Sequence, residues 1–382
     1  MPQKFECRHC EFANILRSSG NLRANIFLNL LMLFLFHSIQ NLGFAQDGVL
    51  MEPRSYVAEY TAEALNIDGV AEEVAWKMAS FSEPFIDIEG YEVPPYQTRV
   101  KMLWDNRYLY IYAQMEEPHV WGTLKLRDTV IFYNNDFEVF IDPDGDTHEY
   151  YELEVNALNT LWDLLLVKPY RNGGSVIDNW DIKGIQSAVA IDGTLNDSGD
   201  KDTGWSVEMA LPWDVLEEAA HGPVPPEGRF WRMNFSRVNW DFQLSDGRYS
   251  RKKDEQGKYL PEYNWVWSPQ QVINMHEPER WGYVYFNPEN ETTVYSIPGE
   301  ERLKWELYAV YRDLLDKDGK DGISGDLDLN EVGAITFREA NLPVVLHYND
   351  AGWYISCKSP ISGNLLMIGR DGKFTINTPT DQ

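Results

Sequence analysis

Cysteine is scarce in this sequence, which limits the covalent and metal chemistry open to it. Cys7, Cys10 and Cys357 are the only three in 382 residues, and the first two lie in a segment that we predict to be removed. The remaining chain then has a single cysteine, so no internal disulfide can form. Cys7 and Cys10 have C-x-x-C spacing, but their position in that segment argues against a zinc or redox site.

Basic residues are also in short supply, with 33 Lys and Arg against 60 Asp and Glu and a formal net charge of -27. A body this acidic repels nucleic acids and anionic membrane surfaces. We therefore expect neither as a partner once the leader is removed. The charge suits a protein that binds a neutral ligand or calcium.

Long apolar runs are absent apart from one near the start, at residues 26–36, which is too short to span a bilayer comfortably. Four basic residues precede it, and Gly43 and Ala45 supply small residues for cleavage. This pattern predicts a signal peptide over residues 1–45, with an uncleaved membrane anchor as the alternative. Its removal takes away four basic and two acidic residues and leaves a net charge of -29. We expect an exported protein, periplasmic or extracellular.

Short runs of alternating apolar and polar residues, separated by turn residues, fill most of the chain after the leader. They predict about nine to eleven strands and two brief helices, which indicates an antiparallel β-sandwich over residues 46–298. The pattern changes after Pro298. Residues 301–316 carry Leu303, Leu307 and Leu314 at helical spacing, and three strand-like runs follow. We predict a separate small α+β appendage over residues 299–382.

Two of the predicted strands, at residues 136–142 and 150–156, carry rows of carboxylate and amide side chains. Alternate residues of a strand face the same way, so the polar rows point away from the apolar residues between them. The polar residues are Glu138, Asp142, Glu152, Glu154 and Asn156. Paired strands would combine the rows into one patch that could bind sugar hydroxyls, which both donate and accept hydrogen bonds. An ordinary solvated sheet face explains the pattern equally well.

Five segments occur in the order found in family 9 carbohydrate-binding modules. They are "LNIDGVAEEVAW", "RVKMLWDNRYLYIYAQ", "NNDFEVFIDPDGD", "GWSVEMALPW" and "ERWGYVYF". Residues 56–290 thus resemble the long bacterial branch of this family. The resemblance implies a sandwich of two antiparallel sheets, sugar binding on one face and structural calcium. It also implies that Glu138 and Asn156 contact sugar, because they match positions that do so in the characterised modules.

The sequence departs from that family in its aromatic clamp. Where those modules hold a sugar between two tryptophans, the nearest rings here are Tyr133 and His276, and Glu154 replaces an arginine. Stacking on a sugar therefore falls to Tyr133 or to Trp162, Trp180 or Trp240. We expect Trp76, Trp104, Trp205 and Trp213 in the core.

Arg237 and Asn239 lie at the end of another strand and could reach the same patch. Alternatively, Arg237 could form a structural ion pair with one of the many carboxylates. With these, the predicted carbohydrate-binding residues are Tyr133, Asn135, Glu138, Glu154, Asn156, Trp162, Arg237, Asn239 and His276.

Calcium is the one expected cofactor, in a structural role. Asp142, Asp144 and Asp146 place three carboxylates on one tight turn, and oxygen ligands at that density suit calcium. Residues 316–322 look like a calcium loop at first, but their glycine falls one place late and no closing glutamate follows. We interpret them as a solvated turn.

Two other classes of function stay open. A glycoside hydrolase needs two carboxylates roughly 5 to 9.5 Å apart, and the patch could supply Glu138 and Glu154. Nothing in the sequence marks either one as a buried acid, and no hydrolase domain fits in the appendage. A haem-binding sandwich would have to use residues such as His119, His148, Met209 or Met233, since Met275 and His276 are adjacent. The sequence favours an exported protein that binds an oligo- or polysaccharide without catalysis.

Overall fold

Extended backbone dominates the computed structural model, which describes residues 51–378 except 290, 292–294, 322–330 and 350–351. The predicted leader, with Cys7 and Cys10, lies outside these residues. Met51–Gln382 form one compact unit, and the predicted boundary at residue 298 stays a prediction. No helix among the described residues is long and apolar enough to cross a membrane.

Thirteen strands form one large curled sheet. Its hydrogen-bonded order is β8-β7-β6-β5-β11-β15-β1-β3-β4-β10-β9, and β14 joins β11 to β2. The strands are β1 Ser55–Tyr60, β2 Ile86–Asp87, β3 Thr98–Trp104, β4 Tyr108–Glu116, β5 Asp136–Asp142, β6 Tyr150–Asn156, β7 Leu161–Leu166, β8 Val176–Ile177, β9 Gln186–Asp192, β10 Gly204–Pro212, β11 Phe230–Asn239, β14 Tyr263–Val266 and β15 Gly282–Phe286. A separate hairpin consists of β12 Phe242–Ser245 and β13 Arg248–Arg251.

Short helices fill connections between these strands. They are α2 Val74–Met78, α3 Trp213–Leu216 and the 3-10 turns η1 Ile131–Tyr133, η2 Tyr170–Asn172, η3 Glu217–Ala219 and η4 Pro278–Arg280. Local chemistry sets the tight turns. Between β3 and β4, for example, the Asp105 carboxylate accepts the backbone N–H groups of Arg107 and Tyr108, both at 2.7 Å.

Strand β1 belongs to both layers of the curled sheet. Residues 55–58 pair with β15, and residues 59–60 pair with β3. Both pairings are parallel, so the sheet is mixed, while the other pairings within the large sheet are antiparallel. The predicted mostly β sandwich is confirmed, and β1 is the strand that joins its two layers.

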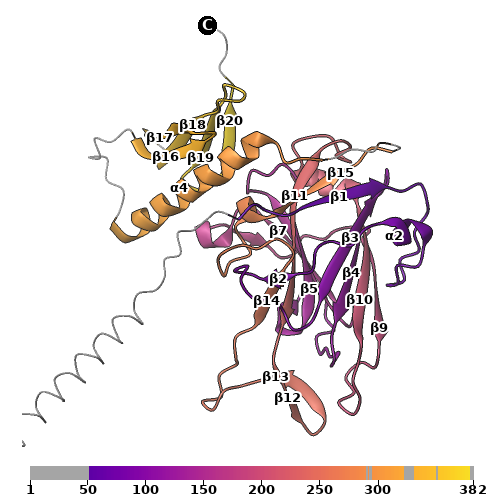
Figure 1. The fold of residues 1–382 in the computed structure, drawn as a ribbon. Coiled ribbons are helices and arrows are strands. Elements are labelled where there is room, and N and C mark those ends of the chain that lie inside the picture. The colour runs from indigo at the N-terminus through magenta and orange to yellow at the C-terminus, as the bar shows by residue number, and fades with distance from the viewer. Residues whose placement is uncertain (1–50, 290, 292–294, 322–330, 350–351, 379–382) are drawn as a thin grey trace, which may run out of the picture. The chain divides into compact units, whose positions relative to one another are not determined.

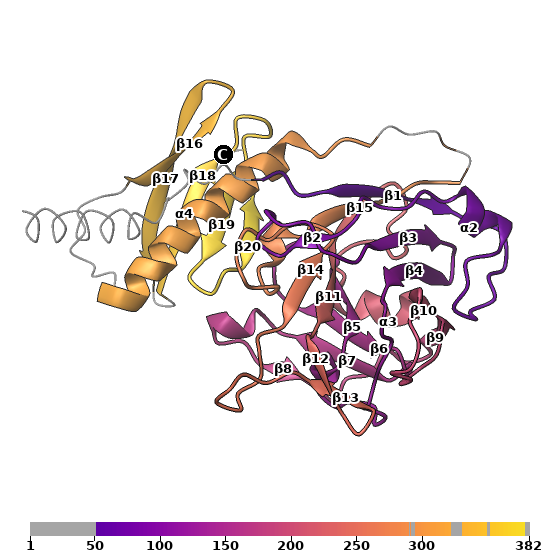
Figure 2. The same ribbon diagram turned by 60° about the horizontal axis from the view of Figure 1, so that its bottom comes forward.

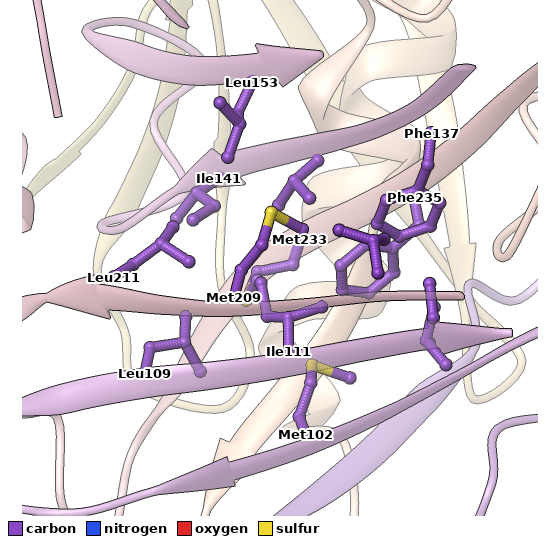
Figure 3. Packing of buried hydrophobic residues seen from close by; sticks show 14 of the residues in the cluster. Met102, Leu109, Ile111, Phe137, Ile141, Leu153, Met209, Leu211, Met233 and Phe235 are labelled. Carbon is purple, nitrogen blue, oxygen red and sulfur yellow. The ribbon is translucent and has the colours of Figure 1, made fainter. Parts of the chain in front are cut away.

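The main core lies between the layers, where apolar residues from both meet. Met102, Leu109 and Ile111 come from one layer, and Phe137 and Phe235 come from the other; Figure 3 shows their side chains directed toward one another. On β5 the core residues alternate with the polar row, as the period of two requires. The four tryptophans expected in the core, Trp76, Trp104, Trp205 and Trp213, are buried.

The C-terminal part has a helix and a small antiparallel sheet, as predicted. Helix α4, Gly299–Asp321, lies across β16 Glu331–Phe337, β17 Ala340–Asn349, β18 Gly352–Lys358, β19 Leu365–Gly369 and β20 Phe374–Asn377 (Figures 1 and 2). Leu303, Leu307 and Leu314 form part of the core beneath it. The turn predicted from residue 316 onward is wrong, because the helix continues to Asp321.

The C-terminal part also contacts the large sheet through polar side chains. Arg312 forms an ion pair with Glu279 at 2.5 Å, and Lys373 forms one with Asp146 at 2.9 Å. The Lys304 ammonium donates to the carbonyl of Gly145. Two of these contacts, those of Lys373 and Lys304, meet the turn that follows β5.

Candidate functional site

The polar rows of β5 and β6 lie on the face of the sheet that points away from the main core. The register pairs Glu138 with Glu154 and Asp136 with Asn156 across the two strands. Directly opposed residues in an antiparallel pair have β-carbons about 4.5–5.5 Å apart, so their side chains are neighbours. The structure therefore brings Glu138, Glu154 and Asn156 to one face, as the alternation predicts.

A cavity of about 390 Å³ opens above this face. Glu138, Glu152 and Glu154 line it together with the apolar side chains of Phe140 and Leu164. Further lining comes from Trp162 on β7 and from segments more distant in sequence, which supply Tyr170, Arg171, Glu262, Asn264 and His276. Acidic groups and aromatic rings together give the cavity the two kinds of surface that a sugar ring needs.

The carboxylates of this face have no strong cationic partner. Across the described chain, the one ion-pair contact to Asp136, Glu138, Glu152 or Glu154 is His276, 4.0 Å from Glu152. Burial lowers the pKa of His276 to about 3, and Arg171 adds to the shift, so the ring is neutral at pH 7. Arg171 also lines the cavity, but its guanidinium is exposed and donates to the carbonyl of Ile273 at 3.1 Å.

Burial perturbs these acids strongly. It raises the pKa of Glu138 to about 7, and Glu262 raises it further while Ser236 opposes the shift. Burial also raises the pKa values of Asp136, Glu152 and Glu154 well above normal, and the neighbouring carboxylates add to each shift. Near neutral pH the Glu138 side chain can therefore act as a carboxyl O–H donor or as a carboxylate acceptor toward a ligand.

Asp136 is the deepest of these acids. It is fully buried, and neither of its carboxylate oxygens has a hydrogen-bond partner within the described residues. The backbone N–H of Val238 lowers its pKa but does not reach hydrogen-bond geometry. Because buried polar groups are almost always paired, this carboxylate calls for an explanation.

Arg237 and the residues around it lie elsewhere. Arg237 follows the alternation of Phe235, so its side chain points toward the interior and pairs with Glu117 at 2.6 Å. Asn239 accepts from Arg237 at 3.2 Å, and Asn135 donates to Glu117 at 3.0 Å. None of the three predicted residues lines the cavity, and the ion-pair alternative is what the structure shows for Arg237.

Asn156 shares the polar face but supports a turn. Its amide donates to the carbonyl of Leu124 at 2.9 Å, and its oxygen accepts from the N–H groups of Leu158 and Thr160 at 3.0 and 3.1 Å. Asn156 does not line the cavity. Its polar groups are thus already engaged in holding the loop after β6.

The aromatic candidates divide into cavity and non-cavity residues. Trp162 and His276 line the cavity, and the Trp162 indole N–H has no partner within the described structure. Tyr133 is 45% exposed and lies under the guanidinium of Arg251, outside the cavity. Trp180 stacks on Tyr151, and the Trp240 indole donates to the carbonyl of Phe132.

The comparison with protein families gives one match. The family model for carbohydrate family 9 binding domain-like proteins matches residues 67–285, more than half of the chain. The chain belongs to this family. A search of curated proteins finds no match.

Solved structures with a similar fold include other family 9 modules. A family 9 module from Caldicellulosiruptor kristjanssonii in complex with cellotriose shares 14% identity and a TM-score of 0.40, covering 64% of this chain and all of that one. The module from the same organism in complex with glucose shares 14% identity and a TM-score of 0.38, covering 64% of this chain and all of that one. A putative carbohydrate-binding protein from Bacteroides uniformis ATCC 8492 shares 15% identity and a TM-score of 0.43, covering 62% of this chain and all of that one.

Several residues that line the cavity or lie beside its carboxylates in this family 9 protein escaped the sequence analysis. Asp136 precedes Glu138 by two positions, so the same alternation would have placed it on the polar face. Glu262 and Asn264 reach the cavity because β14 pairs with β11, and Tyr170 comes from η2. These last contributions depend on long-range pairing, for which a single sequence contains no signal.

The aspartate turn of this family 9 protein brings its three carboxylates close together. One oxygen from each of Asp142, Asp144 and Asp146 lies within 4.8 Å of the others. Asp142 already accepts the backbone N–H groups of Gly145 and Thr147, both at 2.9 Å. The ion pair between Lys373 and Asp146 already supplies positive charge there. Calcium at this turn stays a prediction.

Proposed function

We propose that this family 9 protein binds an oligosaccharide or polysaccharide in the cavity above β5 and β6, without catalysis. The observation that supports it best is the cavity itself, in a protein of a carbohydrate-binding family. It combines Glu138, Glu152 and Glu154 with the indole of Trp162, whose N–H has no partner among the described residues. Carboxyl groups would contact the hydroxyls, and the ring would cover an apolar sugar face.

Two expectations from the sequence complete the proposal. Residues 1–45 direct export to the periplasm or the medium, where polysaccharides are available as ligands. Calcium at Asp142, Asp144 and Asp146 would stiffen the turn after β5. Both are testable, the first by sequencing the N-terminus of the secreted protein and the second by calcium titration of an Asp144→Asn variant.

A glycan array followed by calorimetry tests the binding. Cellotriose and glucose, the ligands named for the similar structures, are the first probes. Replacement of Trp162 with alanine should weaken binding about tenfold, or roughly 1.4 kcal/mol, since ring stacking contributes on that order. Tyr133→Ala is the matched comparison, because Tyr133 lies outside the cavity, and its affinity should change less than twofold. The reverse ranking would move the site to Tyr133, and no binding to any glycan would overturn the proposal.

The hydrolase alternative is tested in the same experiment by measuring whether new reducing ends are released from the glycan. Binding without their release supports a non-catalytic role. Release that disappears in Glu138→Gln would instead make the carboxylates catalytic.

A further inference from the structure

Three acidic side chains of the polar face converge on one point. Asp136, Glu138 and Glu154 each place a carboxylate oxygen within 4.8 Å of the other two. Calcium binds oxygen at about 2.3–2.6 Å, so two ligands on opposite sides of an ion lie roughly 5 Å apart. The three oxygens are therefore spaced to contact a single ion.

These groups repel one another when they are ionised, and a positive charge between them would relieve that repulsion. All three are at least nine-tenths buried, and the described structure gives none of them a lysine or arginine within 4.0 Å. Buried carboxylates normally pair with a cation, coordinate a metal or take up a proton. The surroundings thus favour a positively charged occupant.

Asp136 shows what kind of occupant fits. Its carboxylate is fully buried, has no hydrogen-bond partner among the described residues and does not line the cavity, whereas Glu138 and Glu154 do. A ligand resting in the cavity would touch Glu138 and Glu154 but would not reach Asp136. A bare ion is small enough to sit between all three, beneath the floor of the cavity.

We propose that a divalent cation of the calcium type binds between Asp136, Glu138 and Glu154 and receives the hydroxyls of the sugar in its open coordination positions. Calcium takes 6–8 oxygen ligands, and three carboxylates leave several positions free on the side of the cavity. The second half of this proposal rests on the proposed carbohydrate function. The first half, the cation site, stands without it.

The cation is tested on the full chain without sugar. After EDTA treatment and desalting, CaCl₂ is titrated by calorimetry, and TbCl₃ is titrated with tryptophan-sensitised luminescence, for which Trp162 is well placed. Asp136→Asn should weaken calcium binding at least tenfold, whereas Asp144→Asn, in the turn after β5, should leave this binding event in place. If Asp136→Asn does not fold by circular dichroism, Glu154→Gln takes its place. Loss of the calcium signal in Asp144→Asn alone, or no binding of Ca²⁺, Mg²⁺ or Mn²⁺, overturns the cation site.

The role of the cation in sugar binding is tested separately. Glycan affinity should fall at least tenfold in EDTA and return with CaCl₂. Unchanged affinity in EDTA would overturn this role while leaving carbohydrate binding intact. Calcium binding with no glycan bound would contradict the proposed function and leave the cation site standing. Glycan affinity that is unchanged by EDTA and higher for glucosamine than for glucose would show that an ammonium group of the ligand supplies the charge, which overturns the cation.

Discussion

The ion pair between Glu117 and Arg237 offers a strong test of the placement of Arg237 in the interior. The guanidinium is fully buried, 2.6 Å from Glu117, and its other acceptors are the neutral oxygens of Thr98, Glu116 and Asn239. Burial lowers the pKa of Arg237, and Glu117 opposes that shift. Replacement of Glu117 with glutamine would leave a buried positive charge without its counter-charge.

We expect Glu117→Gln to lower the free energy of unfolding by about 3–5 kcal/mol, the usual cost of breaking a buried pair. For a chain of this size that corresponds to roughly 5 °C in the melting temperature. Urea unfolding followed by tryptophan fluorescence measures the loss. The double variant Glu117→Leu with Arg237→Met should recover much of it, because an apolar pair of similar volume needs no solvation.

Glu306→Gln is the control, since it breaks the pair with Arg302, whose side chain is 68% exposed. It should change the free energy of unfolding by no more than about 0.5 kcal/mol. A loss below 1 kcal/mol in Glu117→Gln would refute the reasoning. A tenfold loss of glycan affinity with unchanged stability would show instead that Arg237 contacts the ligand.

Two further substitutions probe buried polar groups outside the cation site. Glu208 accepts hydrogen bonds from the indole N–H of Trp76 and the backbone N–H groups of Asp68 and Gly69. Glu208→Ala should therefore lower the free energy of unfolding, measured in urea, by at least about 3 kcal/mol. A decrease under about 1 kcal/mol would contradict these contacts. His276 has a folded-state pKa of about 3 against about 6.5 when unfolded, so the unfolded state gains protons first as the pH falls below 6.5. The stability of the natural protein relative to His276→Gln should drop by about 2 kcal/mol between pH 7 and pH 5, and a pH-independent difference would contradict the burial of the ring.

The parts of the fold that depend on local pattern could be predicted from the sequence. The period of two predicted that Glu138 and Glu154 share one face of the sheet. Helical spacing predicted that Leu303 and Leu307 lie on the buried face of a helix. The same alternation, applied to Phe235 and Arg237, would have assigned Arg237 to the interior. Its partner Glu117 comes from a distant strand end, and no local pattern reveals that pairing.

The end of helix α4 shows how tertiary contacts override local preference. Gly319 and the surrounding aspartates favour a turn by their low helix propensity. In the structure Asp318 accepts hydrogen bonds from the side chains of Arg370 and Trp353, at 2.9 and 3.2 Å. These contacts anchor the last part of the helix to the small sheet, and they become visible only once the fold is known.

The pairing of β1 with a strand of each layer has a consequence for how the molecule unfolds. Its first four residues pair with β15 and its last two pair with β3, so these six residues connect the two layers of the sandwich. Neither half can melt without pulling this strand out of the other, and we expect both to lose structure in one cooperative transition. A shortened chain that begins after Tyr60 would expose two strand edges at once and should self-associate.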